Sequence, residues 1–218
     1  MTALRLAHRG DWRRAPENTI AAFRAGLAIA GCDGIELDVR STKDGVPVVL
    51  HDESLLRIQA VDTKLSELTA DQARRHGLPT LAEVFDVIDG KAFVDVELKE
   101  WVPAVMDVLE AARGPRLERA AVSAFDAGVL RQVGRLRPAW QRWLNAVALD
   151  GGVIGRAVDL GCSGVAAQWR SINERSVAAT AAAGLDLIGW TVRRRPTYRR
   201  LEQLGALAIC AEGLALDG

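Results

Sequence analysis

The chain has 218 residues, 49% of them hydrophobic and 26% charged, which is too apolar for a disordered protein and long enough for one domain with a full core. Lys and Arg together number 28, as do Asp and Glu, so no excess positive charge is available to hold a nucleic-acid backbone. No apolar run of about 18 residues and no apolar leader are present. We therefore expect a single domain over residues 1–218, cytoplasmic, with no nucleic-acid partner and no stable membrane insertion.

Short apolar runs alternate with longer helical patterns from end to end, which is typical of repeated βα units around a parallel sheet. Eight runs are predicted to be strands, at residues 4–7, 34–39, 92–98, 120–123, 142–147, 164–167, 185–192 and 207–210. Eight strands with intervening helices favour a closed (β/α)8 barrel of the TIM type. An open doubly wound sheet is the alternative, because periodicity does not report closure.

Apolar spacing also predicts helices between these strands, at residues 18–30, 80–88, 126–136, 172–183 and 196–204. In the second of them, Leu81, Val84 and Ile88 fall on one stripe, as expected of a helix that packs against a barrel. Asp126 and Asn173 are the predicted N-terminal caps of the third and fourth helices.

One stretch departs from the simple βα repeat. Residues 46–50 follow the turn signal Lys43-Asp44-Gly45 directly after the second strand, so we expect a short hairpin extension of that strand. Residues 55–78 then form a polar excursion before the next helix. We expect this small insertion to be a lid or flank beside the barrel mouth.

Polar side chains alternate with apolar ones in the second and third predicted strands. Side chains at i and i+2 share a face, so Glu36 pairs with Asp38, and Glu97 with Lys99. In a barrel the apolar set faces the helices, which leaves both polar pairs pointing inward. Buried like charges need neutralising, and an all-oxygen set suits Mg²⁺ or Ca²⁺ better than zinc. A buried Glu–Lys ion network without a metal is the alternative.

Two of the three histidines lie at predicted strand ends, where barrel active sites gather. His8 ends the first strand and His51 ends the hairpin, so both are candidate catalytic residues beside the inward carboxylates. Arg9 is a candidate for binding an anionic phosphoryl group through its planar fork of donors. His76, in a polar helical segment, is expected to be structural. The run Arg193-Arg194-Arg195 is expected to be a solvated approach to a helix.

These residues belong to a series of motifs that follow one another along the chain: His8-Arg9-Gly10, Pro16-Glu17-Asn18-Thr19, Glu36-Leu37-Asp38-Val39, His51-Asp52, Glu97-Leu98-Lys99, Ser123-Ala124-Phe125-Asp126 and Trp190-Thr191-Val192. In identity and order they resemble the motifs of the glycerophosphodiester phosphodiesterases, over most of the chain. The resemblance implies a TIM-type barrel, a divalent metal, and hydrolysis of glycerophosphodiesters to glycerol 3-phosphate and an alcohol.

The resemblance also implies roles for individual residues, carried over position by position. It implies that Glu36, Asp38 and Glu97 hold the metal. It further implies that His8 and His51 serve as the acid-base pair. The same three carboxylates and two histidines are those singled out by strand spacing and position.

The same resemblance implies that Arg9 and Lys99 bind the phosphate oxygens. Trp190 lies near the end of the seventh predicted strand and is expected to pack over the glycerol or the leaving group, with packing inside the barrel as the alternative. The family often has Asn where this chain has Arg193, and Thr-Asp where it has Ala211-Glu212. The substrate contacts at these positions are therefore open.

Three functions are compatible with this set of residues. The leading hypothesis is the hydrolysis of small glycerophosphodiesters. A phospholipase D-like lyase acting on lyso- or sphingolipids is second, and the lack of a signal sequence and of an apolar membrane-binding patch argues against it. A barrel that binds phosphodiesters without turning them over is third. The short segment after the last strand leaves two expectations open: a barrel that closes less completely, or a homo-oligomer whose partner subunit covers that end.

Overall fold

Nine strands form one continuous sheet in a computed structural model that describes residues 2–217. Eight are parallel: β1 (Leu4–His8), β2 (Gly34–Ser41), β4 (Phe93–Leu98), β5 (Ala120–Ala124), β6 (Arg142–Ala146), β7 (Gly164–Gln168), β8 (Asp186–Val192) and β9 (Ala208–Ala211). β1 pairs with β2 on one side and with β9 on the other, so the sheet closes on itself. The predicted (β/α)8 barrel is confirmed. The open sheet and the incomplete closure are wrong, because β9 pairs with β1 from Leu4↔Ala208 to Ala7↔Ala211.

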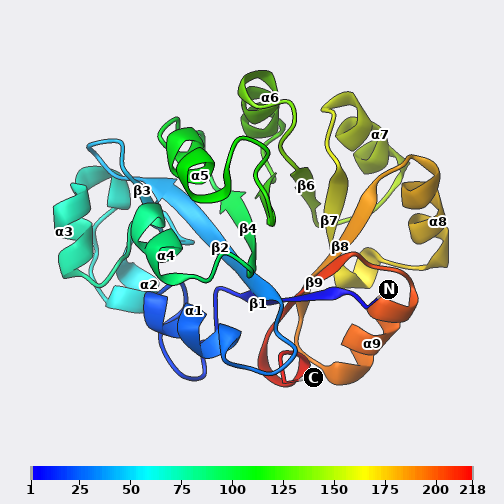
Figure 1. The fold of residues 1–218 in the computed structure, drawn as a ribbon, viewed down its shortest axis with the longest axis horizontal. Coiled ribbons are helices and arrows are strands. Elements are labelled where there is room, and N and C mark those ends of the chain that lie inside the picture. Colours follow the sequence, from blue (N-terminus) through cyan, green and yellow to red (C-terminus); the bar gives the residue numbers. More distant parts are fainter. Residues whose placement is uncertain (1, 218) are drawn as a thin grey trace.

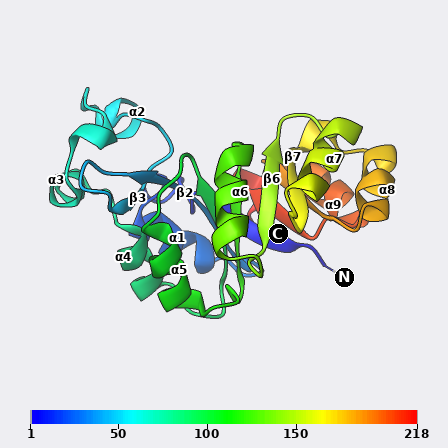
Figure 2. The same ribbon diagram turned by 90° about the horizontal axis from the view of Figure 1, so that it is seen from above.

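The ninth strand, β3 (Pro47–Val49), runs antiparallel to the end of β2 and confirms the predicted hairpin. Beyond it follow α2 (Leu56–Gln59), the 3₁₀ turn η1 (Leu65–Glu67) and α3 (Ala70–Arg75). Leu55, Leu65 and Leu78 are buried in a small cluster with Val48 of β3. Figures 1 and 2 show α2 and α3 beside β3, at one end of the molecule. The insertion is therefore a flank with its own small core.

The longer helices lie around the outside of the strands (Figure 1): α1 (Ile20–Leu27), α4 (Leu81–Val87), α5 (Val105–Arg113), α6 (Ala127–Leu136), α7 (Gly151–Asp159), α8 (Glu174–Ala182) and α9 (Arg195–Gln203). Five of them coincide with the helices predicted from apolar spacing. Both predicted caps are present, because Asp126 accepts a hydrogen bond from the Gly128 amide and Asn173 from the Ser176 amide. These side chains satisfy amide groups that have no partner inside the helix.

Apolar spacing did not delineate α5 and α7. The N-cap of α5, Ala104, makes no side-chain hydrogen bond, so the usual start signal is missing. α7 contains Gly151, Gly152 and Gly155, and glycine disfavours helix by about 1 kcal/mol per residue relative to alanine. Packing against the barrel strands therefore stabilises both helices. No helix among residues 2–217 is long and apolar enough to cross a membrane.

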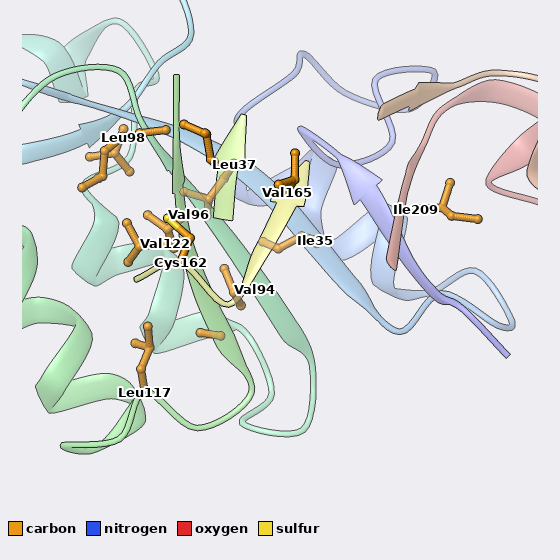
Figure 3. Close-up of a cluster of buried hydrophobic side chains, with 14 of the residues drawn as sticks. Ile35, Leu37, Val94, Val96, Leu98, Leu117, Val122, Cys162, Val165 and Ile209 are labelled. Atoms are coloured by element: carbon orange, nitrogen blue, oxygen red, sulfur yellow. The ribbon is translucent and has the colours of Figure 1, made fainter. Parts of the chain in front are cut away.

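The strands separate two apolar regions. On their outer face, Ile35, Leu37 and Val96 are fully buried against the helices, with neighbours shown in Figure 3. Inside the barrel a smaller cluster consists of Leu6, Phe93, Ala121, Trp143, Ala166, Ile188, Ala208 and Cys210. There the rings of Phe93 and Trp143 stack with centroids 5.6 Å apart. This cluster forms an apolar floor beneath the polar residues at the carboxyl ends of the strands.

Candidate active site

A cavity of about 150 Å³ lies at the carboxyl ends of the strands, and seven of the eight predicted site residues line it: His8, Arg9, Glu36, His51, Glu97, Lys99 and Trp190. The closed parallel barrel explains their convergence, because it brings the carboxyl ends of all its strands to one mouth. The eighth, Asp38, has a completely buried side chain that contacts Arg9 and Lys99. The structure thus brings all eight together.

Three carboxylates form a compact group at the cavity. One oxygen each of Glu36, Asp38 and Glu97 lies within 4.8 Å of the others. Burial raises the pKa of Glu36 well above its usual range, and the charges of Asp38 and Glu97 raise it further. Oε1 of Glu36 is buried without a hydrogen-bond partner among the described residues. This oxygen-only set, in which Oε1 of Glu36 has no partner, fits Mg²⁺ or Ca²⁺.

Two cations lie among these carboxylates. Nζ of Lys99 is 2.8 Å from Oδ1 of Asp38 and also contacts Glu97, while Nε of Arg9 is 3.0 Å from Oδ2 of Asp38. Burial alone would raise the pKa of Asp38, but Arg9 and Lys99 outweigh it and hold the pKa at about 2. Two cations thus face three carboxylates. Arg9 is also shared with Glu17, so a proton on Glu36 or a further bound cation would lower the negative charge that remains.

His8 is held by a carboxylate that directly follows the last strand. Its Nδ1 lies 2.5 Å from Oε1 of Glu212, and Oε2 of Glu212 accepts a hydrogen bond from Nε of Arg193 at 2.7 Å. Burial alone would raise the pKa of Glu212, but the bonds to His8 and Arg193 outweigh it and hold the pKa at about 2. A charged carboxylate at Nδ1 makes that nitrogen the donor. Nε2, which lies 3.7 Å from Oε2 of Glu36 and 3.4 Å from Oγ1 of Thr191, is then the nitrogen that can accept a proton.

Glu212 and Arg193 are the two positions where the sequence departs from the resembled motifs. The structure shows that they contact each other, and that Glu212 also contacts His8. Arg193 is 73% exposed, as expected of a solvated charge run, yet its guanidinium is paired with a buried carboxylate. Neither contact is visible in the sequence, because the first depends on β8 and β9 ending side by side and the second on β9 pairing with β1.

His51 is held in a similar way by its neighbour in the chain. Its Nδ1 lies 2.6 Å from Oδ1 of Asp52, and Asp52 also binds Nε of Arg57 in the insertion. Arg57 donates a second hydrogen bond to Oε1 of Glu17 at 2.7 Å, and Glu17 binds Arg9 at 3.0 Å. Burial lowers the pKa of His51. The insertion therefore reaches the site through Arg57.

Asn18 is a further residue that sequence reasoning left without a role. It adopts a left-handed conformation, with φ of 59°, which Asn tolerates better than most residues. From there its Nδ2 donates to Oδ2 of Asp38 at 2.8 Å. The sequence did hold one clue to Asn18, because it lies in the motif Pro16-Glu17-Asn18-Thr19. That motif resembles the family but had been given no chemical role.

Trp190 packs against the cluster inside the barrel and also lines the cavity. Its Nε1 donates to the carbonyl of Ala166 at 2.8 Å, and its ring meets Phe125 edge-on, with centroids 5.6 Å apart. Deeper in the barrel, Asp95 and Asn145 also line the cavity, and neither was singled out from the sequence. Burial raises the pKa of Asp95 to about 8.

Residues 8–213 match the family model described as the glycerophosphoryl diester phosphodiesterase family. A glycerophosphodiester phosphodiesterase of Caldanaerobacter subterraneus subsp. tengcongensis is 36% identical over 157 residues, which cover 63% of this chain and 64% of the relative. One from Bacillus altitudinis is 34% identical over 152 residues, covering 61% and 62%. The matched segments span less than two thirds of these relatives.

Solved structures show the same fold. An Oleispira antarctica phosphodiesterase in complex with the product sn-glycerol-3-phosphate has a TM-score of 0.84 at 25% identity, over 96% of this chain and 93% of that one. A glycerophosphodiester phosphodiesterase from Agrobacterium tumefaciens has a TM-score of 0.82 at 25% identity, over 99% and 98%. The one from Thermotoga maritima, with a TM-score of 0.84 at 23% identity over 100% and 96%, adds a likeness of fold alone.

Proposed function

The chain belongs to the glycerophosphoryl diester phosphodiesterase family, and from this premise we propose that it hydrolyses glycerophosphodiesters to glycerol 3-phosphate and an alcohol. The observation that carries the proposal is the convergence of two histidines, two cations and three carboxylates at one barrel mouth. The Oleispira phosphodiesterase, which has a similar fold, holds sn-glycerol-3-phosphate as its product. That complex supports the same product class here.

Arg9 and Lys99 bind the phosphate oxygens in this proposal. Burial would lower the pKa of Lys99, but Asp38 and Glu97 outweigh it and raise the pKa, so the ammonium stays charged. Burial would also lower the pKa of Arg9, but Asp38, Glu36 and Glu17 outweigh it and raise the pKa. Both side chains line the cavity, where an anionic phosphodiester would meet them.

Glu36, Asp38 and Glu97 are the residues that would hold Mg²⁺ or Ca²⁺. Such a cation would supply electrostatic stabilisation to the phosphoryl group during its displacement. The chain itself orients the donor set, because Asn18 binds Asp38, and Lys99 contacts both Asp38 and Glu97. Rigid donors do not have to reorganise during the reaction.

His8 and His51 form the acid-base pair. With its Nδ1 bound to a carboxylate, each can use Nε2 for proton transfer. We cast His8 as the base that takes the proton from the glycerol 2-hydroxyl while that oxygen attacks phosphorus. His51 then protonates the leaving alcohol oxygen as its bond to phosphorus breaks, and a cyclic 1,2-phosphate forms. Water then attacks phosphorus and gives a proton to His51, while His8 protonates the 2-oxygen as its bond to phosphorus breaks. The opposite casting of the two histidines is the alternative.

A turnover screen tests the function and its path. Glycerophosphocholine and glycerophosphoethanolamine should be cleaved with Mg²⁺, Ca²⁺ or Mn²⁺, and EDTA should abolish the activity until the cation is restored. Full activity without a cation would contradict the carboxylate assignment. An analogue with hydrogen in place of the 2-hydroxyl should bind but scarcely react, because the attacking group is missing. Its cleavage at close to the natural rate would instead indicate attack by water.

A second substrate class, the lyso- and sphingolipids of a phospholipase D-like lyase, gains support from one observation. Three large apolar side chains are exposed on segments that follow strands at the mouth: Trp12 at 48%, Phe125 at 47% and Leu214 at 62%. Lysophosphatidylcholine cleaved faster than glycerophosphocholine would favour this class. No turnover of either would favour the non-catalytic binding barrel.

A further inference from the structure

We propose that Asn145 and Asp95 form a hydroxyl-binding subsite inside the barrel, and that this subsite takes the glycerol end of the substrate and not the leaving alcohol. The inference rests on the proposed phosphodiesterase function and extends it. It states which end of the phosphodiester enters the barrel and which side chains recognise it.

The strand pattern places both residues between the carboxylates and the apolar floor. Asp95 lies two residues before Glu97 on β4, so it points to the same interior face one step deeper. Asn145 lies two residues after Trp143 of the floor cluster on β6. Both line the cavity, with residual exposures of only 2% for Asp95 and 7% for Asn145. They are the polar part of its deep end.

Both side chains carry hydrogen-bonding capacity that the protein leaves unused. Oδ1 of Asn145 is buried without a hydrogen-bond partner among the described residues, and so is Oδ1 of Asp95. A buried polar group without a partner destabilises the protein, because it has lost its hydrogen bonds to water. A guest that brings hydroxyl groups to these side chains would remove part of that cost. Nothing comparable holds for Lys99, which is already bound to two carboxylates.

Apolar groups lie beside this polar pair. Ala166 is the neighbour of Asn145 across β6 and β7, and the cavity is also lined by Cys210 and by the ring of Trp190, whose side-chain N–H is donated to the Ala166 carbonyl. A space lined by both polar and apolar groups suits a short polyol, which presents both O–H and C–H groups. A polyol attached to a phosphate held by Arg9 would reach into this space. The leaving alcohol would then point out of the mouth.

The test compares two substrate series in one protein variant. One series removes the terminal hydroxyl of the glycerol, giving the phosphocholine diester of propane-1,2-diol, and the other exchanges choline for ethanolamine. Wild type should prefer the intact glycerol by about tenfold or more in kcat/KM, because the analogue leaves a buried polar group unpaired. Asn145→Ala should lose most of that preference and keep its choline-to-ethanolamine ratio. Gln141→Ala, which removes an exposed amide directly before β6, is the matched control and should keep both.

Each outcome decides a different point. An unchanged preference for the terminal hydroxyl in Asn145→Ala overturns the subsite. A changed choline-to-ethanolamine ratio places the leaving alcohol there and also overturns it. If Asn145→Ala does not fold, calorimetry on wild type with Mg²⁺ compares sn-glycerol 3-phosphate with the 1-phosphate of propane-1,2-diol. Equal affinities overturn the subsite. Wild type that cleaves no glycerophosphodiester refutes the proposed function itself, which the two ratios do not test.

Discussion

His8 and His51 are held by the same chemical pattern in two different regions of the molecule. In each case Nδ1 meets a carboxylate, and an arginine binds the second oxygen of that carboxylate. At His8 the carboxylate is Glu212 and the arginine is Arg193, so the ends of β1, β8 and β9 make the arrangement. It belongs to the seam where the barrel closes.

The His51 arrangement belongs to the hairpin and the insertion. Its carboxylate, Asp52, is the next residue in the chain, and its arginine, Arg57, comes from α2. The side chain of Asp52 is 27% exposed, whereas that of Glu212 is 7% exposed. Because water screens charges, the same pattern holds a histidine more firmly in the barrel seam than at the insertion. Burial, not residue type, sets the strength of each arrangement.

Replacing each histidine should have the largest effect. His8→Asn and His51→Asn should each lower kcat by about 10²–10⁴-fold, the usual contribution of a positioned acid or base. With a p-nitrophenyl leaving group, which needs no proton, the loss in His51→Asn should shrink and that in His8→Asn should persist. Steady-state kinetics on both substrates would show this. The reverse pattern would exchange the two roles, and equal losses on both substrates would contradict the division into acid and base.

Replacing the two carboxylates by amides compares the regions directly. Glu212→Gln should lower kcat by about 10²-fold or more, since the amide no longer fixes which nitrogen of His8 carries the proton. Asp52→Asn should lower kcat only about tenfold, because water already screens the interaction between His51 and this more exposed carboxylate. Glu212→Asp, which retains the charge, should recover part of the rate. Larger losses in Asp52→Asn than in Glu212→Gln would reverse the ranking of the two regions.

The pH dependence of stability should differ in Glu212→Gln. The folded pKa of Glu212, about 2, lies below its ordinary value of 4.5. Its stabilisation is therefore fully present above pH 4.5 and is lost as the pH falls toward 2. The shift corresponds to about 3 kcal/mol at neutral pH. Urea unfolding with EDTA should show the wild-type advantage shrinking from pH 6 to pH 3. A constant difference would mean that Glu212 does not stabilise through its charge.

The arginines should show the smallest effects. Arg193→Ala should lower kcat only a few-fold, because the side chain is 73% exposed and exposed ion pairs contribute about 0–1 kcal/mol. Arg57→Ala should lose somewhat more, since Arg57 binds both Asp52 and Glu17. Lys99→Ala is the contrast and should lose far more than either. Equal losses in Lys99→Ala and Arg193→Ala would mean that the phosphate lies elsewhere.

The sequence alone determined the strands and the inward carboxylates. Whether a side chain faces the helices or the barrel interior follows from alternation within one strand, which is a local property. Glu36 and Glu97 therefore line the cavity as predicted, while Ile35 and Leu37 face the helices. The hairpin was also visible, because its turn is marked by Lys43-Asp44-Gly45. The helix α7 was not visible, because its glycines have low helix propensity and the helix is stabilised by tertiary packing.

Only the tertiary structure decided what holds the histidines. His8 and Glu212 are 204 positions apart, and they meet because β9 pairs with β1 at the seam of the barrel. Arg57 reaches Glu17 across 40 positions for a similar reason, through the packing of the insertion beside the mouth. Alternation predicts the face on which a side chain lies, but it cannot say which distant strand will end beside it. That choice is made by the closure of the sheet, which no local pattern reports.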